Sequence, residues 1–130
     1  MSYSILIVDD SSVTRRVVRR SLEMAGLPLG EVIEAGNGIE ALALLGKSWV
    51  DVVFADLNMP EMGGVELVRR MTKDPVLADI PVGVISSDRN AARRRELMRL
   101  GIRAYVSKPF RPEGLRDVVV DLLERGRKAS

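Results

Sequence analysis

The sequence contains no cysteine and no histidine among its 130 residues. The lack of cysteine excludes disulfides, thiolate metal sites and a cysteine nucleophile. The lack of histidine excludes a Ser-His-Asp triad and the usual zinc sites. Long hydrophobic runs are also missing: no segment approaches a membrane span, and too few residues precede the first apolar run for a signal peptide. The remaining chemistry rests on carboxylates, hydroxyls, lysine and the backbone, and we expect a cytoplasmic location.

Charge and size favour an ordinary globular domain. Lysine and arginine number 20 and aspartate and glutamate 18, which gives a net charge of +2. The pI of about 9.3 is high only because no histidine buffers the middle pH range, so we infer no nucleic-acid binding from it. The hydrophobic content of 46% suits a folded protein. We predict a single domain over residues 1–130, with a core from about 4 to 123.

Apolar runs and helical patterns alternate five times along the chain. The apolar runs predict strands at 4–8, 31–35, 51–55, 80–86 and 104–107, the second of them a short edge strand. The helical patterns predict helices at 13–25, 39–46, 65–71, 88–100 and 112–123, followed by a frayed polar tail at 125–130. Alternation with short connections indicates an α/β fold, a parallel sheet with helices on both faces.

Charged residues follow three of the predicted strands directly. Asp9 and Asp10 follow the first strand, Asp56 follows the third, and Lys108 follows the fifth. If these strands are parallel neighbours, the charged groups meet at one edge of the sheet. Carboxylates held about 4 Å apart repel by ~4 kcal/mol per pair at an effective dielectric near 20. A hard divalent cation relieves that repulsion, and oxygen ligands favour Mg²⁺, with Ca²⁺ or Mn²⁺ as alternatives.

Each of these residues also has a purely structural explanation. The aspartates could cap helices or turns, although three carboxylates placed by independent strands favour a shared site. Lys108 could pair with Asp56 or with an anion, or could be a solvated lysine before a turn. The Ser86 hydroxyl could bind a phosphoryl oxygen or cap the end of its strand. Tyr105 could be an amphipathic core or edge residue.

The chain resembles the receiver domains of two-component response regulators, most closely the stand-alone chemotaxis (CheY)-like type. The resemblance covers about residues 4 to 123. It implies a doubly wound, flavodoxin-like (βα)5 sheet of five parallel strands in the order 2-1-3-4-5. Four motifs, taken in order, carry it: Ile5-Leu-Ile-Val-Asp9-Asp10, Asp56-Leu-Asn58-Met-Pro60-Glu-Met-Gly-Gly64, Ser86-Ser87 and Tyr105-Val-Ser-Lys108-Pro109-Phe110.

The resemblance implies a role for each residue of the acidic edge. Asp56 would accept a phosphoryl group from the phosphohistidine of a kinase. Asp9 and Asp10 would hold Mg²⁺ together with Asp56 and the backbone carbonyl of Asn58. The metal ion and Lys108 would neutralise the transferring phosphoryl group.

The resemblance also implies a switch. Ser86 would bind the phosphoryl group after transfer, and Tyr105 could then turn inward. Both movements would rearrange the surface formed by the predicted fourth helix, fifth strand and fifth helix, by shifting a pre-existing equilibrium. The Lys108–Pro109 peptide bond is expected to be cis.

Three positions depart from the family pattern. Gly63 stands where the family often has aspartate, Ser86 replaces the commoner threonine, and Leu57 occupies a position that is tryptophan in some chemotaxis members. The only tryptophan, Trp49, precedes the third strand, at the opposite end of the sheet from the acidic edge. Arginines gather on the predicted fourth helix, as a solvated face or as a surface for an acidic partner: Arg89, Arg93, Arg94, Arg95 and Arg99.

These features predict a single-domain response regulator, a monomeric signalling switch rather than a metabolic enzyme. Its partners would be a histidine kinase or phosphotransfer domain, which the arginines of the first helix could meet, and a downstream target, with no nucleic acid and no membrane. No output segment follows the last helix, and chemotaxis or motility is the suggested pathway. The alternatives are a receiver cut from a multidomain regulator, a phosphorylation-independent binding module, an aspartate-nucleophile phosphatase and a nucleic-acid binder.

Overall fold

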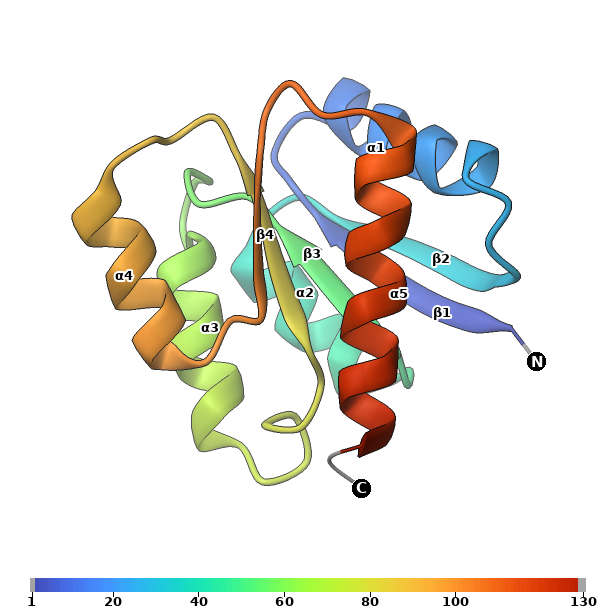
Figure 1. The fold of residues 1–130 in the computed structure, drawn as a ribbon. Helices are drawn as coiled ribbons and strands as arrows, with labels where there is room; N and C mark the ends of the chain where they lie inside the picture. The colour runs from blue at the N-terminus through green and yellow to red at the C-terminus, as the bar shows by residue number, and fades with distance from the viewer. Residues whose placement is uncertain (1, 129–130) are drawn as a thin grey trace.

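Five strands and five helices alternate along the chain in a computed structural model that describes the backbone of residues 2–128 and the side chains of residues 2–124. The strands are β1 (Tyr3–Val8), β2 (Leu29–Ala35), β3 (Val52–Ala55), β4 (Val82–Ser86) and β5 (Ala104–Ser107). The helices are α1 (Ser12–Met24), α2 (Gly38–Leu45), α3 (Gly64–Lys73), α4 (Ala91–Leu100) and α5 (Pro112–Lys128). The strands form one parallel sheet in the order β2-β1-β3-β4-β5, which confirms the predicted fold class (Figure 1).

Two apolar cores lie on the two faces of this sheet. One core receives side chains from α1 and α5, including Leu22 and Leu115. The other receives side chains from α2, α3 and α4, including Leu67 and Leu97 (Figure 1). Successive side chains of a strand point to opposite faces, so a central strand covered on both sides is apolar throughout. All four residues of β3 are buried for this reason, and the first polar side chain comes only where the strand ends.

Several predicted boundaries were wrong. β4 begins at Val82 rather than at 80, and α4 begins at Ala91 rather than at 88. The edge strand β2 is not short: it has seven residues and begins at Leu29, because Leu29 pairs with Tyr3 at the start of β1. Its edge position was predicted correctly. The predicted frayed tail is helical as far as Lys128, and residues 129–130 lie outside the described residues. A helix that already buries one face extends at the cost of ordering one residue per added hydrogen bond.

Glycine brings α3 close to the backbone that follows β3. A Cβ atom at Gly64 would lie 2.4 Å from the backbone carbonyl oxygen of Asp56, closer than any side-chain carbon can approach. The Gly64 N–H donates a 3.0 Å hydrogen bond to the carbonyl of Leu57. The first turn of α3 therefore packs directly against the segment that carries Asp56.

Gly64→Ala is expected to destabilise the protein by about 1–3 kcal/mol, because the added methyl group collides with backbone rather than with a movable side chain. Gly114→Ala is the matched control. Gly114 is exposed on α5 with no atom within 4 Å of the new Cβ, so alanine there should be neutral or stabilising by about 0.5–1 kcal/mol. Urea unfolding of the two variants measures both effects. Equal stability of Gly64→Ala and the wild type would contradict the close approach.

Candidate functional site

The register between β1 and β3 brings the acidic residues together. Val8 pairs with Ala55, so Asp9 and Asp56 leave the sheet side by side. The Asp56 N–H continues the ladder with a 2.9 Å hydrogen bond to the carbonyl of Val8. Carboxylate oxygens of Asp9, Asp10 and Asp56 lie within 4.8 Å of one another. Asp9 is buried, Asp56 is half-buried and Asp10 is exposed, so the cluster is open to solvent on one side.

Two of these carboxylates also stabilise the local backbone. Asp9 Oδ1 accepts a 2.9 Å hydrogen bond from the N–H of Ser11, and Asp56 Oδ1 accepts a 2.8 Å hydrogen bond from the N–H of Leu57. The turn-capping explanation is therefore correct for one oxygen of each residue. The Oδ2 atoms of both carboxylates lie near the ammonium group of Lys108 instead.

The ammonium group of Lys108 lies near the carboxylates of both Asp9 and Asp56. Its Nζ is 3.2 Å from Asp9 Oδ2 and 3.8 Å from Asp56 Oδ2. The sequence suggested Asp56 or an anion as its partner, and the structure places Asp9 closer. The Lys108 N–H donates to the carbonyl of Ser86 at 3.0 Å, which ties the end of β5 to the end of β4. The Lys108–Pro109 peptide bond is cis, as predicted.

The donor set fits a hard divalent cation. Three carboxylates lie close together and one ammonium group contacts two of them, which leaves an excess of negative charge that a cation would reduce. All three side chains offer oxygen, the atom that Mg²⁺ and Ca²⁺ prefer in proteins. Asn58 is exposed two residues after Asp56, in the loop that borders the cluster. Its carbonyl as a fourth protein ligand remains a prediction.

Ser86 and Tyr105 both contact Asp88, in the loop between β4 and α4. Ser86 is buried, and its Oγ accepts a 3.1 Å hydrogen bond from the Asp88 N–H, so in this structure it caps the strand end. Tyr105 is half-buried, and its hydroxyl donates to the carbonyl of Asp88. The Asp88 carboxylate accepts hydrogen bonds from the Asn90 N–H and from Arg93, and these hold its pKa below the usual range. Asp88 thus connects the two predicted switch residues.

Several contacts around the site were not predicted from the sequence. The guanidinium of Arg94 lies 5.1 Å from the centre of the Tyr105 ring, within the range of a cation–π interaction. Arg15 donates to the backbone carbonyl of Asp9 at 2.5 Å and to Glu34 at 2.9 Å. The four-residue spacing of Arg15 and Arg19 was a readable signal for a shared partner on a neighbouring strand. Nothing in the sequence identified Glu34 as that partner.

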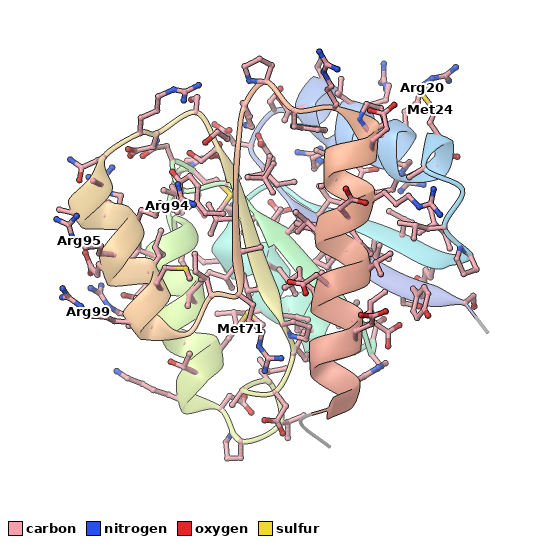
Figure 2. All side chains as sticks on the ribbon, viewed as in Figure 1. Arg20, Met24, Met71, Arg94, Arg95 and Arg99 are labelled. Atoms are coloured by element: carbon pink, nitrogen blue, oxygen red, sulfur yellow. The ribbon has the colours of Figure 1, made fainter. Side chains whose placement is uncertain are left out.

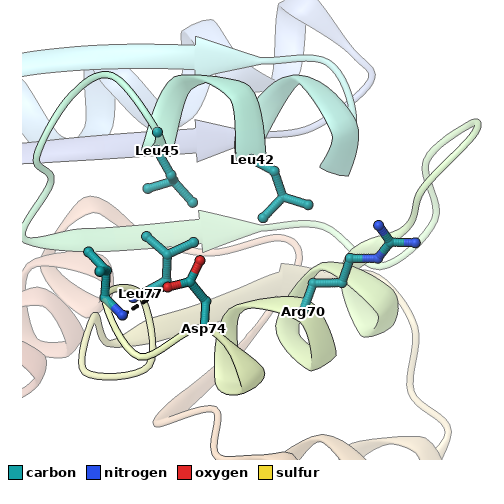
Figure 3. Close-up of a pocket in the computed structure, with 7 residues that line it drawn as sticks. Leu42, Leu45, Arg70, Asp74 and Leu77 are labelled. Atoms are coloured by element: carbon teal, nitrogen blue, oxygen red, sulfur yellow. Dashed lines mark hydrogen bonds between the residues drawn. The ribbon is translucent and has the colours of Figure 1, made fainter.

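A cavity of about 560 Å³ lies away from this site, between α2 and the segment after α3 (Figure 3). Leu42, Leu45 and Leu77 line it together with two charged residues. Arg70 already pairs with Glu66, and Asp74 accepts hydrogen bonds from the backbone of Val76 and Leu77. With its polar groups engaged and no site residue in its wall, this cavity is not the functional centre.

Comparison with known proteins identifies the class. The family described as "Response regulator receiver domain" matches residues 5–120. The chain belongs to this family of two-component receiver domains. Among the described residues, no helix has both the length and the apolar character needed to cross a bilayer.

Particular relatives are chemotaxis proteins. A CheY homolog of Campylobacter jejuni is 36% identical over 94% of this chain and 93% of its own length. CheY1 of Helicobacter pylori is 34% identical over 87% of this chain and 90% of its own length. The solved structure of the chemotaxis response regulator CheY4 of Vibrio cholerae superposes with a TM-score of 0.83, at 32% identity over 95% of this chain and 100% of that one. Receiver domains of this kind are signalling switches that interact with histidine kinases and downstream targets, and the family typically uses Mg²⁺.

Tryptophan fluorescence is expected to respond only weakly to Mg²⁺. Trp49 is exposed and precedes β3, whereas the carboxylates follow the other end of that strand. The four residues of β3 alone separate the two by about 13 Å at a rise of ~3.3 Å per residue. A Mg²⁺ titration followed by emission measures this, with Trp49→Phe as the baseline. A large quench would contradict the placement of Trp49.

Proposed function

We propose that this protein is a response regulator of a two-component phosphorelay, which accepts a phosphoryl group on Asp56 from a histidine kinase. The observation that carries the proposal is the convergence of Asp9, Asp10, Asp56 and Lys108 at one edge of the sheet. A capping role explains one oxygen each of Asp9 and Asp56, but it does not explain why their other oxygens meet a lysine from a third strand. Phosphoryl transfer needs such a combination. An anionic nucleophile lies beside groups that bind a divalent cation, and a positively charged side chain faces the incoming phosphoryl group.

Asp56 serves as the nucleophile in this proposal. One of its oxygens is occupied by the N–H of Leu57, so Oδ2 is the one that attacks phosphorus. A phosphorus–oxygen bond forms while the phosphorus–nitrogen bond of the kinase phosphohistidine breaks, and the histidine nitrogen leaves with the electron pair. Lys108, 3.8 Å from Oδ2, stabilises the negative phosphoryl oxygens. Asp9, Asp10, Asp56 and the Asn58 carbonyl hold Mg²⁺, which supplies further positive charge when bound.

The proposed output surface comprises α4, β5 and α5. Ser86 turns toward the phosphoryl group, Tyr105 turns inward, and the surface of these elements changes. Arg93 pairs with Asp88 and Arg94 lies over Tyr105, so the arginines of α4 are not equivalent. Arg95 and Arg99 lie on the outer side of α4, exposed and outside every ion pair found among the described residues (Figure 2). These two arginines are the part of the surface that suits an acidic target.

Charge reversal at both positions, Arg95→Glu and Arg99→Glu, should abolish the downstream response without preventing phosphorylation. The doubly changed protein should be labelled by acetyl phosphate like the wild type and yet fail to complement a strain that lacks the gene. Lys47→Glu, which reverses an exposed lysine after α2 and outside the proposed output surface, is the control for a general effect of charge. Full complementation by the doubly changed protein would show that α4 is not part of the output surface.

The remaining parts of the proposal concern the setting of this switch. The relatives named as chemotaxis proteins favour control of motility, and we propose that the chain acts in the cytoplasm as a monomeric single receiver domain over residues 1–130. Arg16 and Arg20 are exposed on α1, the helix that follows the loop carrying Asp9 and Asp10. We propose this side for the kinase or phosphotransfer domain.

Intact mass measured after incubation with Mg²⁺ and acetyl phosphate tests the central proposal. We expect one added phosphoryl group in the wild type, none without Mg²⁺, and none in Asp56→Asn, which keeps the shape of the side chain but loses the nucleophile. Asp79→Asn removes an exposed carboxylate outside the acidic cluster and should be labelled like the wild type.

If the wild type shows no adduct, a second measurement is needed, because a short-lived aspartyl phosphate escapes detection. Beryllofluoride binding reports the same site without turnover. A wild type that neither accepts the phosphoryl group nor binds beryllofluoride would favour a phosphorylation-independent binding module. Steady hydrolysis of a small phosphoester would favour a phosphatase.

A further inference from the structure

A group of three charged side chains borders the acidic cluster on the β2 side of the sheet. Arg15 and Arg19 come from α1, and Glu34 comes from the edge strand β2. The two arginines are one helical turn apart, and the side chain of Glu34 lies between them. All three are partly shielded from water, with side-chain exposures of 19%, 39% and 29%. Ion pairs that are partly shielded are screened less by salt than fully exposed ones.

Arg15 connects this group to the proposed metal site. Its Nε donates to Glu34 Oε1 at 2.9 Å, and its Nη1 donates to the backbone carbonyl of Asp9 at 2.5 Å. The guanidinium therefore spans from the edge strand to the backbone of a residue of the acidic cluster. Its position fixes the carbonyl of Asp9 from one side, while the Asp9 N–H is fixed by a 3.0 Å hydrogen bond to Ala35.

Glu34 is shared by both arginines. Arg19 Nη2 lies 2.9 Å from the second oxygen, Oε2, as an ion pair, and it donates a 2.7 Å hydrogen bond to the carbonyl of Val32. The Nε of Arg19 is buried with no hydrogen-bond partner among the described residues, so Arg19 is less completely satisfied than Arg15. No other ion pair among the described residues involves either arginine. Glu34 thus neutralises two guanidinium groups next to the acidic cluster.

Without Glu34, the guanidinium of Arg15 would compete with a divalent cation for the acidic cluster. A long, flexible cation one hydrogen bond away from Asp9, with the exposed carboxylate of Asp10 nearby, is a competitor for any divalent cation. Arginine forms bidentate pairs with carboxylates readily, so an unrestrained guanidinium would turn toward the cluster. The pairing with Glu34 instead orients it toward the backbone carbonyl of Asp9, where it takes up no carboxylate oxygen of the acidic cluster.

We propose that Glu34 is a positioning residue that holds Arg15 against the Asp9 carbonyl and thereby keeps the acidic cluster free for a divalent cation. The proposal rests on the metal site proposed above. It assigns a function to an edge-strand residue that does not itself face the site, and it makes Mg²⁺ affinity depend on an ion pair outside the ligand set.

Titration with Mg²⁺ alone, followed by calorimetry, tests this role. Glu34→Gln should weaken Mg²⁺ binding by about five-fold, the size expected from releasing one partly exposed charge pair. The double variant Arg15→Gln/Glu34→Gln removes the released competitor and should return the affinity to within about two-fold of the wild type. Glu31→Gln, an exposed glutamate on the same strand, should have no effect. Unchanged affinity in Glu34→Gln, or a loss that persists in the double variant, would overturn the proposal.

The ionic-strength dependence separates competition from structural damage. The loss in Glu34→Gln should shrink between about 0.01 M and 1 M salt, as the Debye length falls from ~30 Å to ~3 Å. A loss that is the same at both salt concentrations would indicate a distorted site and would overturn the role proposed here. If the wild type itself fails to bind Mg²⁺, the metal site of the proposed function is wrong. Normal wild-type binding with an unaffected Glu34→Gln refutes only the role of Glu34.

Discussion

The parallel pairing of β1 with β3 is the constraint on which the site depends. Because Val8 and Ala55 are partners in the ladder, the first polar residues after the two strands, Asp9 and Asp56, lie next to each other at the same edge of the sheet. Two carboxylates are thereby held together by backbone hydrogen bonds rather than by any attraction between them. Their repulsion, ~4 kcal/mol per pair at about 4 Å and an effective dielectric near 20, is compensated by the burial of apolar residues along both strands.

Positive charge around this cluster is distributed so that it relieves the repulsion without blocking the pocket. Lys108 reaches two carboxylate oxygens from β5 on one side. Arg15 approaches from the other side but donates to a backbone carbonyl, because Glu34 holds its guanidinium. An ammonium group is a compact point charge on a flexible stem and can shift when an anion or a cation enters. A bidentate guanidinium would be harder to displace, so the difference between these two residues matters for a site that must exchange its occupants.

Strand-end residues were the part of the molecule that could be predicted from the sequence. β1, β3 and β5 read as apolar runs with an abrupt polar end, and a parallel α/β order places Asp9, Asp56 and Lys108 at one edge of the sheet. The strand order that makes these strands neighbours was implied by the family resemblance. Which side chains contact one another could not be predicted in the same way. Whether Lys108 lies nearer Asp9 or Asp56, and whether Arg15 meets Glu34, depends on the packing of elements far apart in the chain. The length of β2 was also missed, since Leu27-Pro28-Leu29-Gly30 reads locally as a loop and is extended only by pairing with Tyr3.

The loop after β4 shows how an event in this pocket can reach α4. The Asp88 N–H donates to the Ser86 hydroxyl, its carbonyl accepts from the Tyr105 hydroxyl, and its carboxylate accepts from Arg93. If the Ser86 hydroxyl turned toward a phosphoryl group on Asp56, its hydrogen bond with the Asp88 N–H would break. Asp88 would then be freer to lose its hydrogen bonds with Tyr105 and Arg93. α4 itself buries only Leu97 fully, so its position depends heavily on these polar contacts and on the pairing of Glu96 with Arg69. An element held by few apolar contacts and several exchangeable hydrogen bonds belongs to the least stable part of a fold, where a local change of charge can shift the population of two arrangements.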